Sequence, residues 1–342
     1  AKFSINLKEG KLEKDSNLIV GIDLGTTNSL VAYMREGQPV AVKGKDGKST
    51  LVPSVIHFDD SQKVIVGDTA KEKLITDPQN TIYSVKRLMG KSYQDVKDYE
   101  NYFGYKIIDE DSESLVKIRV KDKFFTPIEL SAEILKELKR RIEDNLGEVV
   151  SRAVITVPAY FNDAQRQATR DAGKLAGLDV LRIVNEPTAA SLAYGIGLEK
   201  DDNQTVAVYD LGGGTFDISI LRIENGIFEV LSTNGDTFLG GDDFDRVIVD
   251  FWIQQNNLNK QSIADHKELS QALRLQAEQA KKHLSQSNNY EGRVDQIVCK
   301  ISKSQFNEII RPFVDMTIAG CKSALKDAKL SIEHIDHVIM VG

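Results

Sequence analysis

The chain has 342 residues, a formal net charge of −7 and a composition that is 41% hydrophobic and 28% charged. This length predicts two domains or one large bilobed domain, and the acidic balance argues against a protein that binds nucleic-acid backbones. No segment approaches the length of a transmembrane helix, and residues 1–17 lack the apolar core of a signal peptide. Cys299 and Cys321 are too few and too isolated for a disulfide framework or a zinc knuckle. We therefore expect a soluble, cytoplasmic protein that binds neither nucleic acid nor membrane.

The first predicted element lies at residues 18–33 (LIVGIDLGTTNSLVAY). An apolar strand runs into Asp23, Leu24 and Gly25, and two threonines then lead into a second, alternating strand. The small residues between the two strands predict a tight hairpin.

The next segments carry weaker signals. Residues 54–58 predict another strand, and residues 77–90 contain the adjacent cations Lys86 and Arg87. A pair of surface cations is usually solvated and has no further role. Residues 95–125 are charged and irregular, with short alternating pieces, and they predict a small peripheral β subdomain.

Residues 126–194 alternate helices with strands. Thr126 and Glu129 form a capping box, Pro127 suits the first helical position, and Gly147 ends the helix. The elements that follow are a strand at 153–157 closed by Pro158, a helix capped by Asn162 and Gln165 that ends near Gly177, a strand at 180–184, and a helix from Glu186 to Tyr194. This alternation predicts an α/β core.

The polar residues 199–204 (EKDDNQ) predict the boundary to a second lobe, which opens with a hairpin at 206–221 (VAVYDLGGGTFDISIL). The elements predicted after it are a strand at 228–232, a helix from Asp242 to about Gln255 behind Gly240 and Gly241, a helix from Lys267 to Ser285, a helix capped by Ser302 and Gln305 that runs to about Leu330 with a bend at Pro312, and a strand at 335–341. An apolar strand of this last kind normally leads into a covering helix. We therefore expect the sequence to be part of a longer chain.

The run Gly212-Gly213-Gly214 gives the second hairpin its chemistry. Consecutive glycines accept positive φ, lie close to a ligand, and let successive N–H groups converge on an anion such as phosphate. Asp210 and Asp217 place carboxylates at the mouth, where Mg²⁺ could join them to the phosphates. For one copy alone, an ordinary glycine-rich hairpin with two solvated aspartates is an equally good interpretation.

The same device occurs twice. Asp23-Leu-Gly-Thr-Thr and Asp210-Leu-Gly-Gly-Gly-Thr follow equivalent strands in the two halves of the chain. Chance repetition of an ordinary hairpin explains this poorly, whereas two lobes that face one phosphate chain explain it well.

Duplicated hairpins of this type in two α/β lobes resemble the fold shared by actin and the sugar kinases. Six longer strings are similar to the nucleotide-binding domain of the DnaK-type heat-shock chaperones: GIDLGTTNS (21–29), VKRLMG (85–90), VITVPAYFNDAQRQAT (154–169), NEPTAA (185–190), DLGGGTFD (210–217) and GGDDFD (240–245). The resemblance covers residues 18–342. It implies an α/β, actin-like ATPase fold with an N-terminal extension at 1–17, lobe I at 18–198, an incomplete lobe II at 199–342, and a nucleotide cleft flanked by the two hairpins.

Within that family, four features resemble the HscA branch, which serves iron–sulfur cluster assembly. They are the extension before the first strand, VKRLMG, an Asp at position 242, and the stretch QFNEIIRPFV followed by CKSALKDA. A general protein-folding chaperone of the same family is the alternative.

The resemblance implies roles at matching positions around the phosphates. Lys86 and Glu186 would orient the attacking water, and Asp23 and Asp210 would hold hydrated Mg²⁺, with Asp217 near a K⁺ site. The residues expected to wrap the phosphates of ATP or ADP are Gly25, Thr26, Thr27, Asn28, Gly212, Gly213, Gly214 and Thr215. Asp210 and Thr215 are counted with Lys86 and Glu186 as catalytic.

The resemblance also implies an adenosine site. The residues expected to enclose the nucleoside are Gly240, Gly241, Asp242, Glu278, Lys281, Lys282, Ser285 and Gly342. Lys282 departs from the arginine of eukaryotic members, whose planar guanidinium stacks better on adenine than an ammonium does. Adenine affinity is therefore the property that this position puts in doubt.

The family further implies a monomer that switches a peptide-binding domain, which this chain lacks. Pro158 and Arg166 match positions that relay the nucleotide state, and Arg182 matches a contact for a J-domain co-chaperone, although a solvated cation explains Arg182 equally well. The client expected for the HscA branch is an iron–sulfur scaffold protein. A metabolite kinase and an actin-like polymer subunit are the competing hypotheses, and both fit the motif strings less well.

Overall fold

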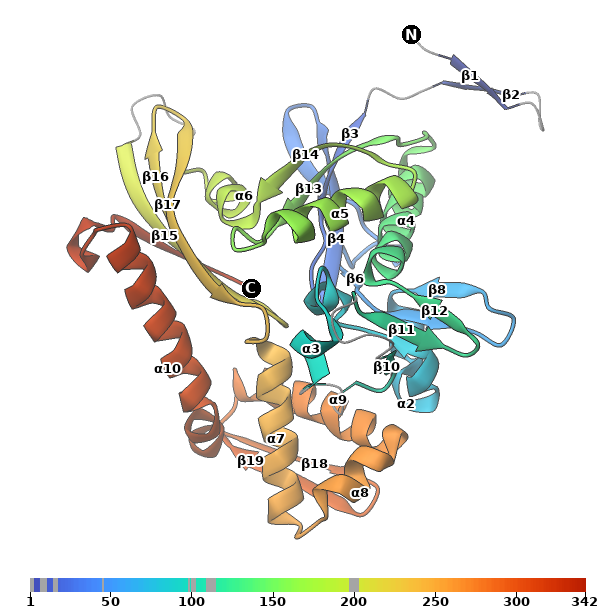
Figure 1. Ribbon diagram of the computed structural model, residues 1–342, viewed down its shortest axis with the longest axis vertical. Coiled ribbons are helices and arrows are strands. Elements are labelled where there is room, and N and C mark those ends of the chain that lie inside the picture. Colours follow the sequence, from blue (N-terminus) through green and yellow to red (C-terminus); the bar gives the residue numbers. More distant parts are fainter. Residues whose placement is uncertain are drawn as a thin grey trace. The chain divides into compact units, whose positions relative to one another are not determined.

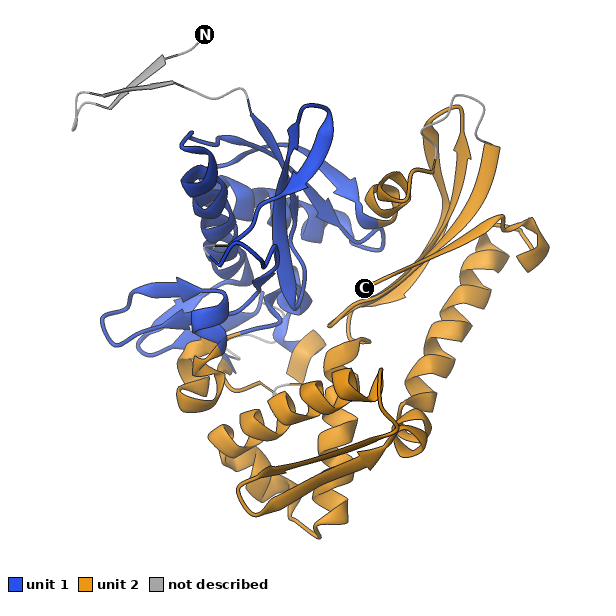
Figure 2. Cartoon of the chain, turned by 180° about the vertical axis from the view of Figure 1, so that it is seen from behind, with its two compact units in different colours: residues 1–71, 83–94, 107–186 blue, residues 72–82, 95–106, 187–342 orange. Residues whose placement is uncertain are grey.

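The computed structural model describes residues 3–6, 11–14, 18–44, 46–97, 99, 103–108, 115–196 and 203–342. The chain divides into two compact units, shown in Figure 2: unit 1 has residues 1–71, 83–94 and 107–186, and unit 2 has residues 72–82, 95–106 and 187–342. The predicted boundary at 198/199 lies outside the described residues. So do residues 1–2, 7–10 and 15–17 of the predicted extension, in which β1 (Phe3–Asn6) pairs with β2 (Lys11–Lys14). The lobe limits therefore stay predictions.

Unit 1 is built on a mixed sheet in which three parallel strands adjoin a hairpin. The strand order is β14-β13-β3-β4-β5, and β6 pairs with β4 (Figure 1). Strands β14, β13 and β3 run parallel, whereas β3, β4 and β5 form an antiparallel meander. The bounds are β3 (Ile19–Asp23), β4 (Asn28–Arg35), β5 (Gln38–Ala41), β6 (Val52–Pro53), β13 (Arg152–Val157) and β14 (Asp179–Asn185).

Two capped helices pack on this sheet and on each other: α4 (Pro127–Leu146) and α5 (Asp163–Leu175). Both predicted capping boxes are confirmed, Thr126 with Glu129 and Asn162 with Gln165. Gly147 ends α4 in the left-handed conformation at φ 68°, as predicted. Local signals therefore set the starts of both helices correctly.

The remainder of unit 1 is peripheral. The strand predicted at 54–58 is wrong in its start: only β7 (Ile56–Phe58) forms, because Ser54 donates its N–H to the carbonyl of Thr27 at 2.8 Å. The other elements are β8 (Val64–Val66), α1 (Asp68–Lys71), the 3-10 turn η2 (Val85–Leu88), β10 (Lys106–Ile108), β11 (Lys117–Val120) and β12 (Lys123–Phe125). Strands β10, β11 and β12 form one sheet, which confirms the small β subdomain.

Unit 2 has a four-stranded sheet of order β17-β16-β15-β20. Its strands are β15 (Asn203–Leu211), β16 (Phe216–Glu224), β17 (Ile227–Asp236) and β20 (His337–Val341). Because strand side chains alternate between faces, Val206 and Val208 pack toward α6 (Glu186–Ala193), whereas Ala207 lies in the cluster that α10 (Lys303–Asp327) completes. Both faces of the hairpin are therefore packed.

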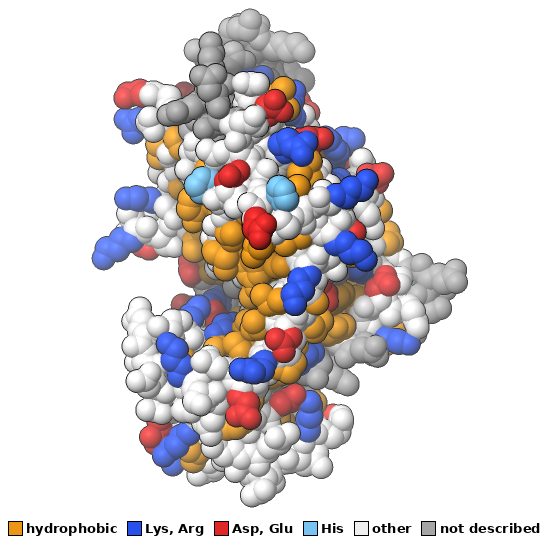
Figure 3. All heavy atoms as spheres, turned by 90° about the vertical axis from the view of Figure 1, so that its left-hand side faces the viewer, with side chains coloured by type: hydrophobic (Ala, Val, Ile, Leu, Met, Phe, Trp, Pro, Cys, Tyr) orange, Lys and Arg blue, Asp and Glu red, His pale blue; other side chains and the backbone are white. Residues whose placement is uncertain are grey.

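Helix α10 starts as predicted, with Ser302 and Gln305 as its capping box, and continues through Pro312. It ends at Asp327, earlier than the predicted Leu330. Figure 3 shows the side of the molecule on which α10 lies, and hydrophobic side chains gather there in a band between charged ones. The exposed hydrophobic side chains of α10 and β20 are Val314, Met316, Ile318, Val338 and Met340.

A second core in unit 2 surrounds Trp252, which is fully buried between two helices and a hairpin. Its elements are α7 (Gly241–Gln255), α8 (Lys260–Asp265), α9 (Lys267–Leu284), β18 (Asn289–Val294) and β19 (Ile297–Ser302). The remaining described elements are α2 (Lys73–Thr76), η1 (Pro78–Asn80), β9 (Thr81–Ile82), α3 (Tyr93–Val96) and η4 (Ile332–His334). None of the helices described is both long and apolar enough to cross a membrane.

The central strands of the two main sheets have equivalent neighbours. Strand β3 has an antiparallel hairpin partner, β4, and a parallel neighbour, β13, and β15 stands in the same relation to β16 and β20. Asp23 pairs with Thr156 across the parallel neighbour, and Asp210 pairs with Val341. The duplication inferred from the two Asp-Leu-Gly strings is therefore a duplication of strand topology.

Candidate functional site

The first hairpin loop, residues 24–27, is held by a ring of hydrogen bonds around Gly25. The N–H of Gly25 donates to Ser29 Oγ at 3.2 Å, and Ser54 Oγ donates to the carbonyl of Gly25 at 2.8 Å. The two hydroxyl oxygens lie 2.8 Å apart. A carbonyl oxygen only accepts hydrogen bonds, so the Ser54 hydroxyl must donate its hydrogen to Gly25. The Ser29 hydroxyl is therefore the donor in its hydrogen bond with Ser54. Both polar groups of the loop's central residue are thereby fixed.

Burial makes this ring rigid. Ser29 and Ser54 are 1% and 2% exposed, so water cannot replace their hydrogen bonds. A Cβ on Gly25 would lie 2.0 Å from the carbonyl oxygen of Asn28, and no side chain fits there. Thr26 is also buried, whereas Asn28 is exposed at the start of β4. The loop therefore presents a preset backbone to any bound group.

Asp23 lies at the carboxyl edge of the parallel strands. Its Oδ1 accepts a hydrogen bond from Thr156 Oγ1 at 3.3 Å, and its side chain is on the exposed face of β3. Asn185 pairs with Val157 at the same edge, and Glu186 follows directly. Ligands of open α/β sheets bind at this edge, because the loops that leave the strands converge there.

Lys86 and Glu186 form an ion pair within unit 1. The ammonium of Lys86 lies 2.8 Å from Glu186 Oε1, and the two side chains are 9% and 17% exposed. The same ammonium lies 5.9 Å from the centre of the Phe161 ring. A solvated surface lysine is therefore the wrong interpretation of Lys86. The residue lies in η2, which begins after Ser84 in the left-handed conformation at φ 55°.

Arg166 joins the end of β13 to the end of β14. Its guanidinium donates to Asn185 Oδ1 at 2.9 Å and to the carbonyls of Ala159 at 3.0 Å and Pro158 at 3.4 Å. Pro158 and Arg166 are thus in direct contact, and both lie beside the residue that precedes Glu186. Arg182 is exposed on β14, the edge strand of its sheet.

The second hairpin turn spans residues 211–216. The N–H of Gly212 donates to the carbonyl of Thr215 at 3.0 Å, and this closes the turn. Asp210 and Asp217 face each other across the two strands. Asp217 is 4% exposed and accepts hydrogen bonds from Thr233 Oγ1 at 3.1 Å and Ser219 Oγ at 3.3 Å.

The Gly240-Gly241 segment packs directly on this turn. Gly241 donates its N–H to the carbonyl of Gly212 at 2.9 Å, and Asp242 donates to that of Gly213 at 2.7 Å. A Cβ on Gly240 would lie 2.8 Å from the carbonyl oxygens of Gly212 and Gly213, so this close approach requires glycine. The predicted phosphate turn and the predicted adenosine segment are therefore one packed assembly.

Lys281 on α9 stabilises this assembly. Its ammonium donates to the carbonyl of Gly241 at 2.8 Å and lies 2.7 Å from Asp245 Oδ1. Asp245 has a side chain only 2% exposed, and this burial raises its pKa to about 6 against the pull of Lys281. Asp243 accepts the N–H of Gly240 at 2.9 Å.

The other predicted adenosine residues lie near the end of α9. Glu278 and Lys282 form an ion pair at 2.5 Å, with the Lys282 side chain 67% exposed, and Ser285 caps the helix. Gly342 lies beside the second hairpin turn, because a Cβ there would be 2.3 Å from the carbonyl oxygen of Leu211. Gly342 and the Gly240 segment thus meet the same turn from two directions.

The donor set suits a nucleotide with a hydrated cation. Among the described residues, no three His, Cys, Asp or Glu side chains converge as ligands for one metal ion. Mg²⁺ needs only one or two carboxylates when phosphates and water supply the remaining oxygens. Asp23 in unit 1 and Asp210 in unit 2 each lie next to a backbone loop, so either carboxylate by itself meets that requirement.

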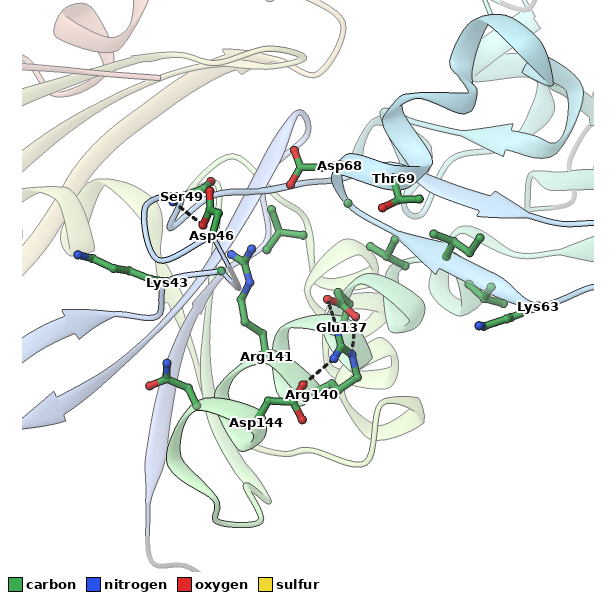
Figure 4. A pocket seen from close by; sticks show the side chains of 17 residues that line it. Lys43, Asp46, Ser49, Lys63, Asp68, Thr69, Glu137, Arg140, Arg141 and Asp144 are labelled. Atoms are coloured by element: carbon green, nitrogen blue, oxygen red, sulfur yellow. Dashed lines mark hydrogen bonds and ion pairs between the residues drawn. The ribbon is translucent and has the colours of Figure 1, made fainter.

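A separate hollow of about 840 Å³ lies in unit 1, away from these loops in sequence (Figure 4). Arg140 pairs with Glu137 and Asp144 in its wall, and Arg141 donates to the carbonyl of Thr50. Its charged lining balances, with Lys43, Lys63, Arg140 and Arg141 against Asp46, Asp68, Glu137 and Asp144. This balance favours no particular ligand.

A model of the Hsp70 protein family matches residues 19–342. The chain belongs to the Hsp70 family. The family has the actin-like ATPase fold, and the mixed α/β architecture with its duplicated sheets agrees with that class. Hsp70 proteins are chaperones whose ATPase domains bind ATP or ADP with Mg²⁺, and they work with J-domain co-chaperones and client proteins.

Several residues that support the site were not predicted from the sequence. Ser54 and Thr156 belong to segments far from the motifs they support, and no local pattern marks them. Asp243 and Asp245 lie inside the string GGDDFD, where aspartates next to two glycines were a usable signal, and the structure shows that both are buried.

Proposed function

We propose that this Hsp70 domain hydrolyses ATP, with Lys86 and Glu186 acting on the attacking water. The observation that carries the proposal is the largely buried 2.8 Å pair between these side chains, at the sheet edge that also bears Asp23. A lysine held by a carboxylate at a fixed point suits a γ-phosphate, where equatorial charge must be stabilised.

Each half-site has a defined task. The Gly25 loop, clamped by Ser29 and Ser54, offers backbone and hydroxyl donors to phosphate oxygens, and the Gly212–Gly214 turn does the same in unit 2. Asp23 and Asp210 hold the cation through its water shell, and Mg²⁺ when bound neutralises charge on the phosphates. Asp217 is buried and hydrogen-bonded to Thr233 and Ser219, and we assign it to an accompanying K⁺ site.

In unit 1 the attacking water is oriented by Lys86 and Glu186. Glu186 holds the ammonium in place, and the ammonium positions the water in line with the bond to be broken. Because phosphoryl transfer depends on positioning and charge stabilisation, no covalent intermediate with the protein is required. In unit 2 Lys281 supports the glycine segment through its contacts with Gly241 and Asp245, and Lys281 and Glu278 would also bind the ribose hydroxyls.

We further propose that nucleotide state is relayed through Pro158 and Arg166 to a peptide-binding domain elsewhere in the protein. The contacts of Arg166 with the carbonyls of Pro158 and Ala159 and with Asn185 support this, because Asn185 precedes Glu186. The exposed Arg182 would meet the J-domain co-chaperone. Free Cys299 and Cys321 are compatible with a reducing cytoplasm, where we place the protein.

We propose iron–sulfur cluster assembly as the cellular role, with a scaffold protein as the client. Its support is the set of sequence strings shared with the HscA branch, including Asp242. The test is ATPase stimulation of the full-length protein. A scaffold protein with its dedicated J-protein should stimulate hydrolysis, and an unfolded peptide with a general J-protein should not. The reverse result would make the protein a general folding chaperone.

A further inference from the structure

The first turn of α5 reaches two different segments of unit 1 through neighbouring side chains. Arg166 bonds to Asn185, as described above. Gln165, one residue earlier, turns the other way: its Nε2 donates to the carbonyl of Met89 at 3.2 Å. Gln165 is 4% exposed and Met89 is 1% exposed, so this hydrogen bond is shielded from water.

Met89 and Gly90 end the short turn that carries Lys86. The turn starts at Ser84 with φ 55° and finishes at Gly90 with φ 67°, so left-handed residues bound it on both sides. A non-glycine residue in that conformation stores strain and persists only where its surroundings hold it. Within the turn itself, the closing bond from the N–H of Met89 to the carbonyl of Lys86 is long, at 3.4 Å.

Gln165 holds the C-terminal end of this turn in place. Its Nε2 satisfies the buried carbonyl of Met89, which would otherwise lack this donor. Gly90 packs on the same side chain, since a Cβ there would lie 2.9 Å from Gln165 Cγ. The C-terminal end of the Lys86 turn is therefore fastened to α5, the helix that also holds Asn185 next to Glu186.

We propose that Gln165 is a positioning residue that sets the place of the Lys86 ammonium against Glu186. The inference rests on the proposed function of that pair. The Lys86 turn is bonded to Gln165 through Met89, and Glu186 follows Asn185, which is bonded to Arg166. Because Gln165 and Arg166 are consecutive residues of α5, these bonds fix the separation of Lys86 and Glu186. Loss of the Gln165 donor would loosen the Lys86 turn without touching the nucleotide loops.

Gln165 also has an ordinary structural role, and the two roles can be separated. Its Oε1 accepts the N–H of Asn162 at 3.2 Å, and its own N–H donates to Asn162 Oδ1 at 2.9 Å, as in a capping box. Gln165→Glu keeps the acceptor for the cap but removes the donor to Met89. Asn162→Ala weakens the cap but leaves the donor to Met89 in place.

The experiment measures single-turnover ATP hydrolysis, equilibrium nucleotide affinity and melting temperature of the 342-residue chain. Gln165→Glu should slow hydrolysis roughly 10-fold or more, as for a small misplacement of a catalytic group, and leave affinity within about 2-fold. Asn162→Ala should lower the melting temperature and leave hydrolysis unchanged. Gln167→Glu is the matched control, because Gln167 is exposed on the same helix and bonds locally to Asp171.

Lys86→Ala and the double variant Lys86→Ala/Gln165→Glu complete the set. If Gln165 acts through Lys86, the double variant should be no slower than Lys86→Ala alone. Amide hydrogen exchange across residues 85–90 should also become faster in Gln165→Glu.

The inference would be overturned if Gln165→Glu hydrolysed ATP at the wild-type rate. It would also be overturned if Asn162→Ala lost as much of the hydrolysis rate as Gln165→Glu. Wild-type hydrolysis in Lys86→Ala would instead overturn the proposed function.

Discussion

The ammonium of Lys86 lies 2.8 Å from Glu186 Oε1, although 100 residues separate the two in the chain. The pair is mostly buried and joins a strained turn to the carboxyl edge of a parallel sheet. The desolvation of two largely buried charges offsets much of their attraction, so a pair in this place is better explained by what it positions than by what it stabilises.

Lys86→Ala should therefore impair chemistry more than binding. We expect hydrolysis to fall roughly 10²-fold or more, as for the loss of one well-placed electrostatic donor, with nucleotide affinity within a few-fold. Lys86→Arg should not restore the rate, because a forked guanidinium cannot occupy the same point beside Glu186. Single-turnover hydrolysis and equilibrium binding on the same preparations check both expectations. A few-fold effect on hydrolysis would contradict them.

Ser54→Ala should open the ring around Gly25. The substitution leaves the Gly25 carbonyl and the Ser29 hydroxyl with one partner fewer in a buried place, at about 1–3 kcal/mol of unfolding free energy. Nucleotide affinity should fall as the loop loses its preset conformation. Denaturant unfolding and nucleotide titration measure the two effects. Ser61→Ala, at an exposed serine that bonds to Asp59, should change neither.

The ring also predicts non-additivity. Because Ser29 and Ser54 are in contact, the double variant Ser29→Ala/Ser54→Ala should lose less stability than the two single losses combined. Strict additivity would show that the two hydroxyls act independently and that the ring is not a unit.

Gly240→Ala should displace the second phosphate turn. The new Cβ would lie 2.8 Å from backbone atoms of Gly212 and Gly213, which cannot yield as a flexible side chain could. We expect nucleotide affinity to fall roughly tenfold or more, about 1.4 kcal/mol. The control is Gly21→Ala on β3, where no atom of the described residues lies within 4 Å of the added Cβ. Equal affinities for the two variants would refute the close-packing argument.

Asp245 should make stability depend on pH. Burial raises its folded-state pKa to about 6, above the ordinary 3.8, so the folded state holds the proton more tightly than the unfolded state does. Its contribution to the unfolding free energy is thus greatest below pH 3.8 and is lost as the pH rises to about 6. The loss is on the order of 1.4 kcal/mol for every pH unit that separates the folded-state and unfolded-state pKa values. Asp245→Asn should remove this slope. The difference between wild type and variant, measured by denaturant unfolding across this range, should become flat once the pH is well above about 6.

Much of the secondary structure was predictable because its signals are local. The capping boxes at Thr126 and Asn162 each involve residues three positions apart, so the sequence alone shows where both helices begin. The glycine run at 212–214 likewise indicates its turn without help from elsewhere. The prediction of a strand at 54–58 was wrong in its start for the opposite reason. Ser54 is hydrogen-bonded to Thr27, and no local pattern indicates that contact.

The candidate site likewise has features that local sequence predicts and contacts that only the structure shows. The helix–strand alternation and the repeated Asp-Leu-Gly strings by themselves indicated an α/β protein with two aspartate-glycine hairpins, because strand alternation and backbone freedom are properties of consecutive residues. Only the tertiary structure decided that Lys86 meets Glu186, that Ser54 closes the ring on Gly25, and that Lys281 spans Gly241 and Asp245. Those contacts join distant segments. In unit 1 the parallel strands bring Glu186 to the sheet edge where Lys86 meets it, and in unit 2 the packing of α9 on α7 brings Lys281 to Gly241 and Asp245.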